Sequence, residues 1–276
     1  MEKRKILVTG ASGLIGGLVI KHLADKYEFS GLSRRPVPGI PHLMADVTDA
    51  EAIRPAFAGI HTVLLLAAGT GPVRTEAWSS TMAITVQGTL NGYETARLAG
   101  VKRVVFFSSG SVQVGWEWDA AYPFGRMTSG PDSEIPPTWP MVGVDWPVRP
   151  CNPYAVGKLF GENLGRYYAD RYGISTLVIR LGAVLAEDRP RLRRHFMHFL
   201  SHADCVQIVD KCLGAPESLL YDVFHAVSEN KYRWYSTDHT KQVLGWKPTG
   251  TADIFPMPQR MAKLGEPIQA PKPAPT

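Results

Sequence analysis

Short apolar runs alternate with amphipathic stretches along the first two thirds of this 276-residue chain. The apolar runs predict strands, because short apolar segments bounded by turn residues are typical of strands buried in a sheet. The stretches between them carry the helical spacing of apolar positions. Predicted strands cover residues 5–9, 29–33, 62–67, 104–108 and 175–180, and predicted helices cover residues 14–26, 50–58, 80–99 and 153–172. Strands that alternate with helices predict βαβ units and a mainly parallel, doubly wound sheet of the α/β class.

Residues with capping preferences mark the ends of three predicted helices. Asn152 is expected to cap the helix that begins with Pro153, and Asp49 to cap the helix at 50–58. Gly100 follows the helix at 80–99, where a left-handed residue is common and glycine adopts that conformation readily.

The regular pattern breaks between residues 116 and 150. This segment contains seven prolines and four tryptophans. Proline at this density predicts no regular element, and a loop this long in a compact domain is usually functional or disordered. The tryptophans argue against disorder, since disordered chains are poor in aromatic residues. We interpret the segment as a partly ordered loop over a substrate site; the alternative is an insertion packed on the surface.

Composition excludes several classes of protein. Hydrophobic residues make up 45% of the chain and charged residues 20%, an ordinary globular balance. The apolar runs fall short of the ~20 residues that a membrane-spanning helix needs. The net charge of +5 is too small and too dispersed to indicate a nucleic-acid-binding protein. Cys151, Cys205 and Cys212 form no CxxC pair, no His or Cys spacing resembles a metal-ligand set, and no signal peptide is expected. We therefore expect reduced thiols, no metal and a cytoplasmic location.

A glycine-rich turn follows the first predicted strand. Its sequence is Thr9-Gly10-Ala11-Ser12-Gly13-Leu14-Ile15-Gly16, with the spacing GxxGxxG. Glycines at a strand-to-helix turn let a pyrophosphate approach the backbone N–H groups at the helix N-terminus. The alternative is a plain structural turn; the position after the first strand favours a dinucleotide site.

The end of the second predicted strand carries two arginines. NAD-binding folds place an acidic residue there to accept the ribose hydroxyls, whereas this chain has Ser33-Arg34-Arg35. Guanidinium groups bind a phosphate bidentately, so Arg34 and Arg35 favour NADP over NAD, with NAD still possible. Both arginines are alternatively solvated loop residues. Asp46 is a candidate acceptor for the adenine amino group.

Tyr154 and Lys158 lie four residues apart on the predicted helix at 153–172 and therefore on one face. A tyrosine acts as acid or base near neutral pH only when its phenolate is stabilised, which a nearby ammonium does. Ser109 and Ser111 follow the strand at 104–108, at the carboxyl end where α/β sheets bind ligands. Chance spacing and ordinary turn chemistry are the alternatives. A basic run from Arg189 to Arg194 either contacts an anionic substrate or is a solvated face.

Together these motifs resemble the extended short-chain dehydrogenase/reductase superfamily, in its NAD-dependent epimerase/dehydratase group. The resemblance rests on TGASGLIG, LLLAAG, the paired serines, PYAVGK and the Ile179–Gly182 strand end, and it extends from about Lys5 to Trp246. Within that group, the short length and the tracts YAVGKLFGENLGRYY, FLSHAD and LGWKP are closest in pattern to uronate dehydrogenases.

The resemblance implies a Rossmann core, a nicotinamide cofactor and a homodimer. It makes Tyr154 the acid/base, Lys158 its partner, and Ser109 the hydroxyl that orients the substrate, with Ser111 as a rival. Arg180 then lies at a substrate carboxylate, or else forms a structural ion pair. Uronate dehydrogenases have Asn-His where this chain has Gly110-Ser111, which puts uronate recognition in question. The implied cofactor-binding residues are Gly10, Ser12, Gly13, Leu14, Ile15, Gly16, Ser33, Arg34, Arg35, Asp46, Val47, Ala67, Ala68, Gly69, Tyr154 and Lys158, and the implied substrate-binding residues are Ser109, Gly110, Ser111 and Arg180.

We expect residues 1–182 to form the cofactor-binding core, residues 183–265 a small substrate-binding lobe, and the proline-rich residues 266–276 a disordered tail. The favoured function is an NAD(P)-dependent oxidoreductase that interconverts a secondary alcohol and a carbonyl on a small, sugar-like substrate. A nucleotide-sugar epimerase or dehydratase would use the same triad with a tightly held NAD, but would need a larger C-terminal region. A non-catalytic redox sensor on this scaffold is the third hypothesis, and the intact Tyr–Lys pair weakens it.

Overall fold

The computed structural model describes residues 3–68 and 78–257. Within them, one parallel sheet of seven strands has the order β3-β2-β1-β4-β5-β6-β7. The strands are β1 (Lys5–Thr9), β2 (Glu28–Ser33), β3 (His42–Met44), β4 (Thr62–Leu65), β5 (Arg103–Ser109), β6 (Ser175–Leu181) and β7 (Tyr221–Ala226). The strands on either side of β1, β2 and β4, are both parallel to it, as expected of a doubly wound fold. The predicted fold class is confirmed.

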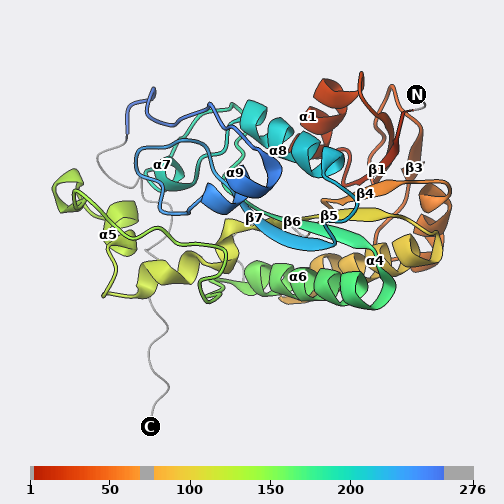
Figure 1. Ribbon diagram of the computed structural model, residues 1–276, viewed down its shortest axis with the longest axis horizontal. Helices are drawn as coiled ribbons and strands as arrows, with labels where there is room; N and C mark the ends of the chain where they lie inside the picture. Colours follow the sequence, from red (N-terminus) through yellow and green to blue (C-terminus); the bar gives the residue numbers. More distant parts are fainter. Residues whose placement is uncertain (1–2, 69–77, 258–276) are drawn as a thin grey trace, which may run out of the picture.

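Helices cover both faces of this sheet (Figure 1). On one face lie α1 (Leu14–Leu23) and α8 (His202–Gly214), packed on strand residues such as Ile6 and Val8. On the other lie α2 (Ala50–Ile53), α4 (Gly88–Leu98) and α6 (Pro153–Tyr172), packed on Leu7 and its neighbours. Alternate residues of each strand thus enter two separate cores, which explains why the strands read as continuous apolar runs.

Local sequence signals set the helix ends. The side chain of Asn152 caps α6 by accepting a hydrogen bond from the Ala155 N–H at 2.8 Å, and Asp49 caps α2 in the same way. Gly100 has a φ of +72°, in the left-handed region. The predicted helix at 50–58 is split, because a 3-10 turn, η1 (Arg54–Phe57), follows α2. The predicted helix at 80–99 also divides, into α3 (Trp78–Ser80), a π-helical stretch η2 (Thr81–Gln87) and α4.

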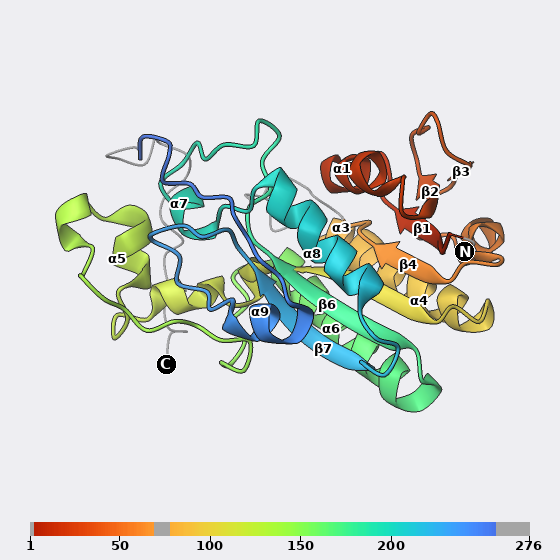
Figure 2. The ribbon, with the colours of Figure 1, turned by 45° about the horizontal axis from the view of Figure 1, so that its top comes forward.

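A lobe lies beyond the carboxyl ends of the central strands (Figure 2). It has its own aromatic core, in which the rings of Phe124 and Trp234 stack with centroids 4.8 Å apart. The chain pairs across it at an isolated parallel bridge between Val142 and Tyr235. Its short elements are η3 (Gly110–Val112), η4 (Val114–Trp118), α5 (Phe124–Ser129), η5 (Asp132–Glu134) and α7 (His195–His198). The helix α9 (Asp238–Leu244) instead packs on β7, where the His239 and Phe224 rings stack with centroids 5.7 Å apart.

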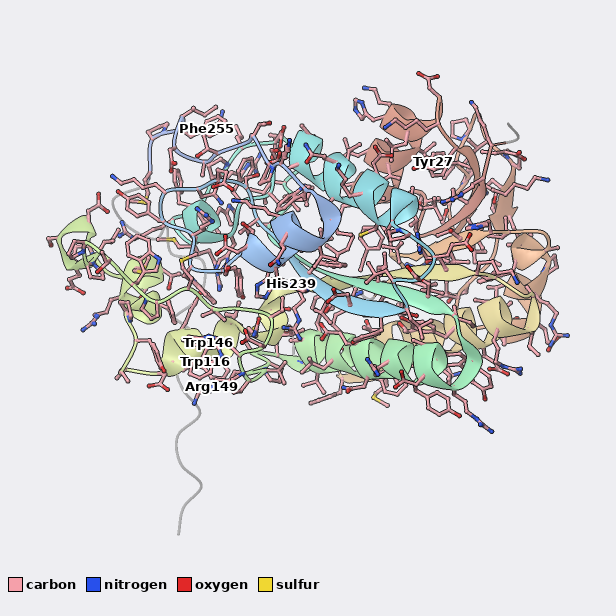
Figure 3. All side chains as sticks on the ribbon, viewed as in Figure 1. Tyr27, Trp116, Trp146, Arg149, His239 and Phe255 are labelled. Atoms are coloured by element: carbon pink, nitrogen blue, oxygen red, sulfur yellow. The ribbon has the colours of Figure 1, made fainter. Side chains whose placement is uncertain are left out.

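The proline-rich segment 116–150 is more ordered than its composition predicts. The expectation of no regular element is wrong at α5, which begins after Pro123 and ends before Pro131 in a gap without proline. The tryptophans anchor the segment: the rings of Trp116 and Trp146 meet edge to face at 5.0 Å, and the Arg149 guanidinium lies 4.2 Å from the Trp116 ring centroid (Figure 3).

Residues after Leu181 supply both lobe and core. The segments with α7 and with Trp234 and Tyr235 belong to the lobe, but α8 packs beside α1 and β7 forms the edge of the sheet next to β6. Among the described residues, none of the helices has the length and apolar character needed to cross a membrane.

Candidate active site

The first turn of α6 presents Tyr154 and Lys158. The cap by Asn152 fixes where the helix begins, and Pro153 fits its first position because the missing N–H has no partner there. Tyr154 then lies one turn before Lys158, whose Nζ is 5.5 Å from the centroid of the Tyr154 ring and 5.0 Å from that of Phe106. The predicted placement of this pair on one helix face is therefore present in the structure.

Burial shapes the charge of both groups. Lys158 is 1% exposed, and desolvation lowers its pKa to about 7, while the carboxylate of Glu162 acts in the opposite direction. Burial also raises the pKa of Tyr154 to about 12. Loss of water penalises the charged form of each group, so the ammonium becomes more acidic and the phenol less acidic. Burial therefore weakens the preference of Lys158 for its charged form.

Two serine hydroxyls meet at the carboxyl end of β5. The Oγ of Ser109 accepts hydrogen bonds from the Ser111 hydroxyl at 2.9 Å and from the Ser111 N–H at 3.2 Å. The Cys151 N–H donates to the Ser111 carbonyl at 3.3 Å, which ties this turn to the residue just before the α6 cap. Both predicted hydroxyls thus lie together beside the start of α6.

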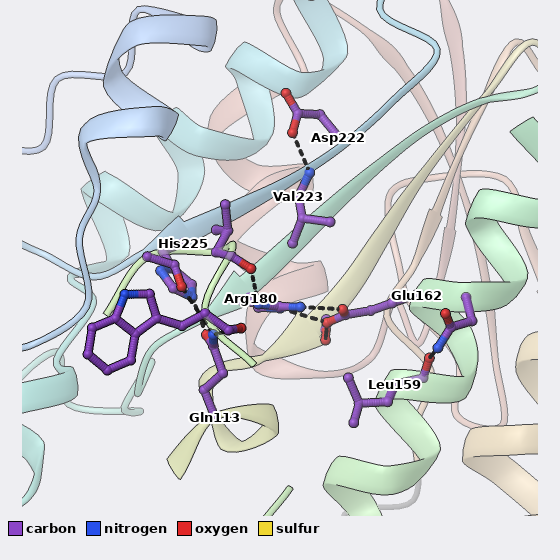
Figure 4. A network of polar contacts seen from close by, with 12 residues as sticks. Gln113, Leu159, Glu162, Arg180, Asp222, Val223 and His225 are labelled. Carbon is purple, nitrogen blue, oxygen red and sulfur yellow. Dashed lines mark hydrogen bonds and ion pairs between the residues drawn. The ribbon is translucent and has the colours of Figure 1, made fainter. Parts of the chain in front are cut away.

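Arg180 lies beneath this turn in a buried ion pair (Figure 4). Its Nε and Nη2 donate to the two carboxylate oxygens of Glu162 at 3.0 and 2.8 Å, and its Nη1 donates to the Val144 carbonyl at 3.2 Å. Ser108 adds a 2.5 Å hydrogen bond to Glu162. Arg180, predicted to lie at a substrate carboxylate or in a structural ion pair, has the second of these arrangements.

Glu162 was not among the residues predicted from the sequence, although a signal for it existed. It follows Lys158 by four residues, and so continues the helix face that carries Tyr154. Gln113 was also missed. Its side chain joins the loop carbonyls of Gly143 and Trp146 to the buried ring of His225, whose Nε2 is 2.7 Å from the Gln113 Oε1 (Figure 4).

The glycine turn at the carboxyl end of β1 has the shape that a dinucleotide requires. Gly10 has a φ of +71°, and a Cβ on it would lie 3.1 Å from the Ala67 nitrogen of the neighbouring strand end. A Cβ on Gly16 would lie 2.9 Å from the Ala11 Cα. Gly13 caps α1 without a side-chain hydrogen bond, which leaves the helix N-terminus open to an anion. These residues fit the pyrophosphate of a nicotinamide cofactor.

The two arginines after β2 lie beside this turn. Arg35 donates from Nη2 to the Ser12 carbonyl at 3.2 Å, and Ser33 donates to the Arg35 carbonyl at 2.8 Å. The Arg34 side chain is 71% exposed, with its Nη1 4.0 Å from an Asp46 oxygen. Asp46 itself accepts from the Thr48 N–H, and this hydrogen bond lowers its pKa.

The remaining predicted cofactor-binding residues of the described chain lie after β4 and β3. The Ala67 N–H donates to the Thr9 hydroxyl at 3.2 Å, which joins the ends of β1 and β4. Val47 is buried beside Gly88 of α4. Ala67 and Ala68 are half-buried, whereas Gly69 lies outside the described residues.

Comparison with known proteins agrees with this geometry. The model of the NAD dependent epimerase/dehydratase family matches residues 6–209. The chain is 34% identical over 256 residues to L-arabinose 1-dehydrogenase (NAD(P)(+)) of Haloferax volcanii, covering 88% of this chain and 96% of that protein. It is 33% identical over 262 residues to an NAD-dependent glucose-6-phosphate dehydrogenase of the same organism, covering 91% and 95%.

The crystal structure of uronate dehydrogenase from Agrobacterium tumefaciens superimposes with a TM-score of 0.74 and 29% identity, covering 91% of this chain and 86% of that one. The predicted enzyme class, an oxidoreductase that uses a nicotinamide cofactor, is confirmed by these relatives. On the sequence match, the sheet and the glycine turn together, the chain belongs to the NAD-dependent epimerase/dehydratase family.

Proposed function

We propose that this protein is an NAD(P)-dependent sugar dehydrogenase in which Tyr154 is the general base. The observation that carries the proposal is the buried Lys158 one turn after Tyr154, on a helix whose start is tied to the Ser109–Ser111 turn by the hydrogen bond from the Cys151 N–H to the Ser111 carbonyl. The names of the relatives support a sugar-like substrate, since they denote dehydrogenases of a sugar, a sugar phosphate and a sugar acid.

In the oxidative direction, Tyr154 takes the proton of the substrate hydroxyl. The Lys158 ammonium stabilises the phenolate that this step requires, which offsets the effect of burial on the Tyr154 pKa. Ser109 or Ser111 donates a hydrogen bond that orients the substrate oxygen. When bound, the nicotinamide ring supplies the hydride acceptor.

The cofactor is held from the β1 side of the sheet. The backbone N–H groups at the start of α1 bind the pyrophosphate, and Lys158 contacts the nicotinamide ribose. Arg34 and Arg35 bind a ribose 2′-phosphate, which favours NADP while NAD remains usable. Arg35 supports this assignment, because it already reaches the Ser12 carbonyl of the glycine turn.

We also infer a homodimer and a cytoplasmic location. Exposed apolar side chains on α4 and α6 support an interface there: Leu98, Val156, Phe160, Tyr167 and Tyr172. The three free cysteines agree with a reducing compartment. Residues 183–265 are assigned to substrate binding in part, through α7 and the segment with Trp234 and Tyr235.

The test is to incubate the purified protein with a panel of aldoses and uronates and each of NAD⁺ and NADP⁺, and to follow the absorbance of the reduced cofactor. We expect one equivalent of reduced cofactor per substrate oxidised, faster with NADP⁺. An isomerised sugar without net cofactor reduction would contradict the proposal and favour an epimerase. No turnover of any sugar would contradict both.

A further inference from the structure

A second buried carboxylate, Glu117, lies in the lobe between a cation and an imidazole. Its Oε2 is 3.5 Å from Arg194 Nη2, and its Oε1 is 3.3 Å from His198 Nε2. The side chains of Glu117 and His198 are about nine-tenths buried, and that of Arg194 is one-third exposed. Desolvation lowers the pKa of His198, which favours its neutral form. Glu117 and Arg194 are then the two charged groups of the cluster.

This cluster borders the proposed reacting residues. Tyr235 donates a 2.5 Å hydrogen bond to the carbonyl of Gly110, between the two site serines, and its ring lies 5.3 Å from that of His198. The backbone N–H of Cys151 donates to the Ser111 carbonyl. Burial raises the pKa of the Cys151 thiol to about 11, while the charge of Arg194 lowers this pKa and that of Glu117 raises it. The cluster therefore lies beside the serine turn and the start of α6.

The Glu117 carboxylate has spare capacity to accept hydrogen bonds. A carboxylate has about four acceptor positions. Within residues 3–68 and 78–257, its side chain has only the Arg194 and His198 contacts, both near the upper limit of hydrogen-bond length. A carboxylate that is largely shielded from water and loosely partnered is suited to accept hydrogen bonds from sugar hydroxyls.

The same arrangement opposes an anionic substrate. Arg180 and Arg194 are each paired with a glutamate, Glu162 or Glu117. A substrate carboxylate or phosphate near Arg194 would approach the buried Glu117 charge and compete for its partner. Such like-charge juxtaposition is a strong discriminating element.

We propose, building on the sugar dehydrogenase function above, that this enzyme takes neutral aldoses in preference to uronates and sugar phosphates, and that Glu117 sets this preference. Glu117 accepts hydrogen bonds from the substrate hydroxyls, and its charge excludes substrate anions. Arg194 orients Glu117.

The experiment compares substrates that differ only at one end of the sugar. L-Arabinose, D-galactose and D-galacturonate share ring stereochemistry and carry hydrogen, hydroxymethyl and carboxylate respectively; D-xylose, D-glucose, D-glucuronate and glucose 6-phosphate form a second series. For the wild-type protein we expect kcat/KM for the best neutral sugar to exceed that of its acidic counterpart at least about 100-fold. This corresponds to about 2.7 kcal/mol.

Glu117→Gln keeps the size of the side chain and removes its charge. We expect the acidic-to-neutral ratio of kcat/KM to rise at least about tenfold, and the KM of the neutral sugar to rise. Glu187→Gln is the matched control. Glu187 pairs with Arg191 at the surface, in the segment that leads to Arg194. Partial misfolding lowers both activities and leaves their ratio unchanged, so the ratio reports the charge itself.

The outcomes separate the two proposals. A wild-type enzyme that reduces cofactor with uronates or sugar phosphates in preference to neutral sugars overturns the neutral-substrate inference and leaves the dehydrogenase function intact. An unchanged ratio in Glu117→Gln overturns the role of Glu117. If Glu117→Gln does not fold, two other measurements test the role of Glu117. They are the acidic-to-neutral ratio of kcat/KM in Glu117→Asp and the inhibition of neutral-sugar oxidation by uronates in the wild type. Failure of every sugar to reduce the cofactor contradicts the dehydrogenase function.

Discussion

Two regions of the candidate site differ in the groups that form them. At the carboxyl end of β1 the groups are backbone atoms of the glycine turn, whereas at the carboxyl ends of β5 and β6 they are buried side chains. The first region uses glycines and an uncapped helix start, with Arg34 largely exposed beside it. The second places Lys158, Glu162 and Arg180 together with 1 to 6% of their surface exposed. A polar group at the first region is screened by water, while charges at the second act on one another at low dielectric.

This difference predicts where substitutions act. At the cofactor end, a change at an exposed side chain such as Arg34 alters a local contact and leaves the fold intact. At the chemical end, each charge stabilises or shifts another, so that one substitution changes stability and chemistry together.

The largest expected effect is on the chemical step. Tyr154→Phe removes the hydroxyl that exchanges the substrate proton, and we expect kcat to fall about 10²- to 10⁴-fold while the Kd of the cofactor stays the same. Steady-state rates and calorimetric titration with the cofactor measure the two quantities. Tyr167→Phe, at an exposed tyrosine of the same helix, serves as the control. Wild-type activity in Tyr154→Phe would show that the general base is another residue.

Breaking the buried ion pair is expected to affect stability almost as strongly. Glu162→Gln leaves the Arg180 guanidinium buried without its counter-ion and should lower the free energy of unfolding by about 3–5 kcal/mol. Glu51→Gln breaks an exposed pair with Arg54 and should cost less than about 1 kcal/mol. Denaturant unfolding of both variants measures the contrast. Equal losses would mean that burial does not distinguish the two pairs.

Burial of Lys158 predicts a pH dependence with a definite sign. Its pKa is about 7 in the folded protein, against 10.5 for an ordinary lysine side chain, so between these values the unfolded chain binds more protons. The free energy of unfolding should therefore gain about 1.4 kcal/mol per pH unit from this group as the pH rises from 7.

Lys158→Met removes that gain, and denaturant unfolding at pH 7 and 9 measures it as the difference between wild type and variant. Lys102→Met, at an exposed position, provides the comparison. Parallel pH profiles of wild type and Lys158→Met would contradict a depressed Lys158 pKa.

The smallest effects are expected at the cofactor end. Arg35→Ala and Arg34→Ala should each lower the ratio of kcat/KM with NADP⁺ to that with NAD⁺ about tenfold, as the loss of one charged hydrogen bond predicts. Assays with both cofactors at a fixed sugar concentration measure the ratio. Arg54→Ala is the control for the loss of an exposed arginine elsewhere. A ratio unchanged by either substitution would remove these arginines from cofactor selection.

The same contrast explains what could be predicted from the sequence. Helix ends depend on neighbouring residues, so Asn152 and Pro153 predicted the start of α6, and Gly100 predicted the end of α4. The glycine turn could be predicted for the same reason, because its conformation depends on a few successive residues. The Tyr154–Lys158 pair was readable because helical periodicity alone places both on one face.

The buried ion pair could not be predicted in this way. It depends on the parallel register of β5 and β6, which sets Ser108 opposite Arg180, so that both reach Glu162 of α6. Register between strands more than 60 residues apart is set by packing of the whole sheet and leaves no local pattern. The Glu117 cluster likewise joins η4 to α7 across some 80 residues of chain.

The positions of α8 against the sheet and of β7 at its edge limit how this enzyme can be recombined with its relatives. Asp210 of α8 accepts hydrogen bonds from Lys26 and Tyr27, just after α1, and the Arg4 guanidinium donates to the Leu213 carbonyl. A chimaera that exchanges everything after residue 182 would replace one side of these contacts along with the lobe. Crossover points that leave them intact lie on either side of α8 and β7. Grafting a new substrate specificity therefore requires two separate cassettes, one around α7 and one around Trp234 and Tyr235.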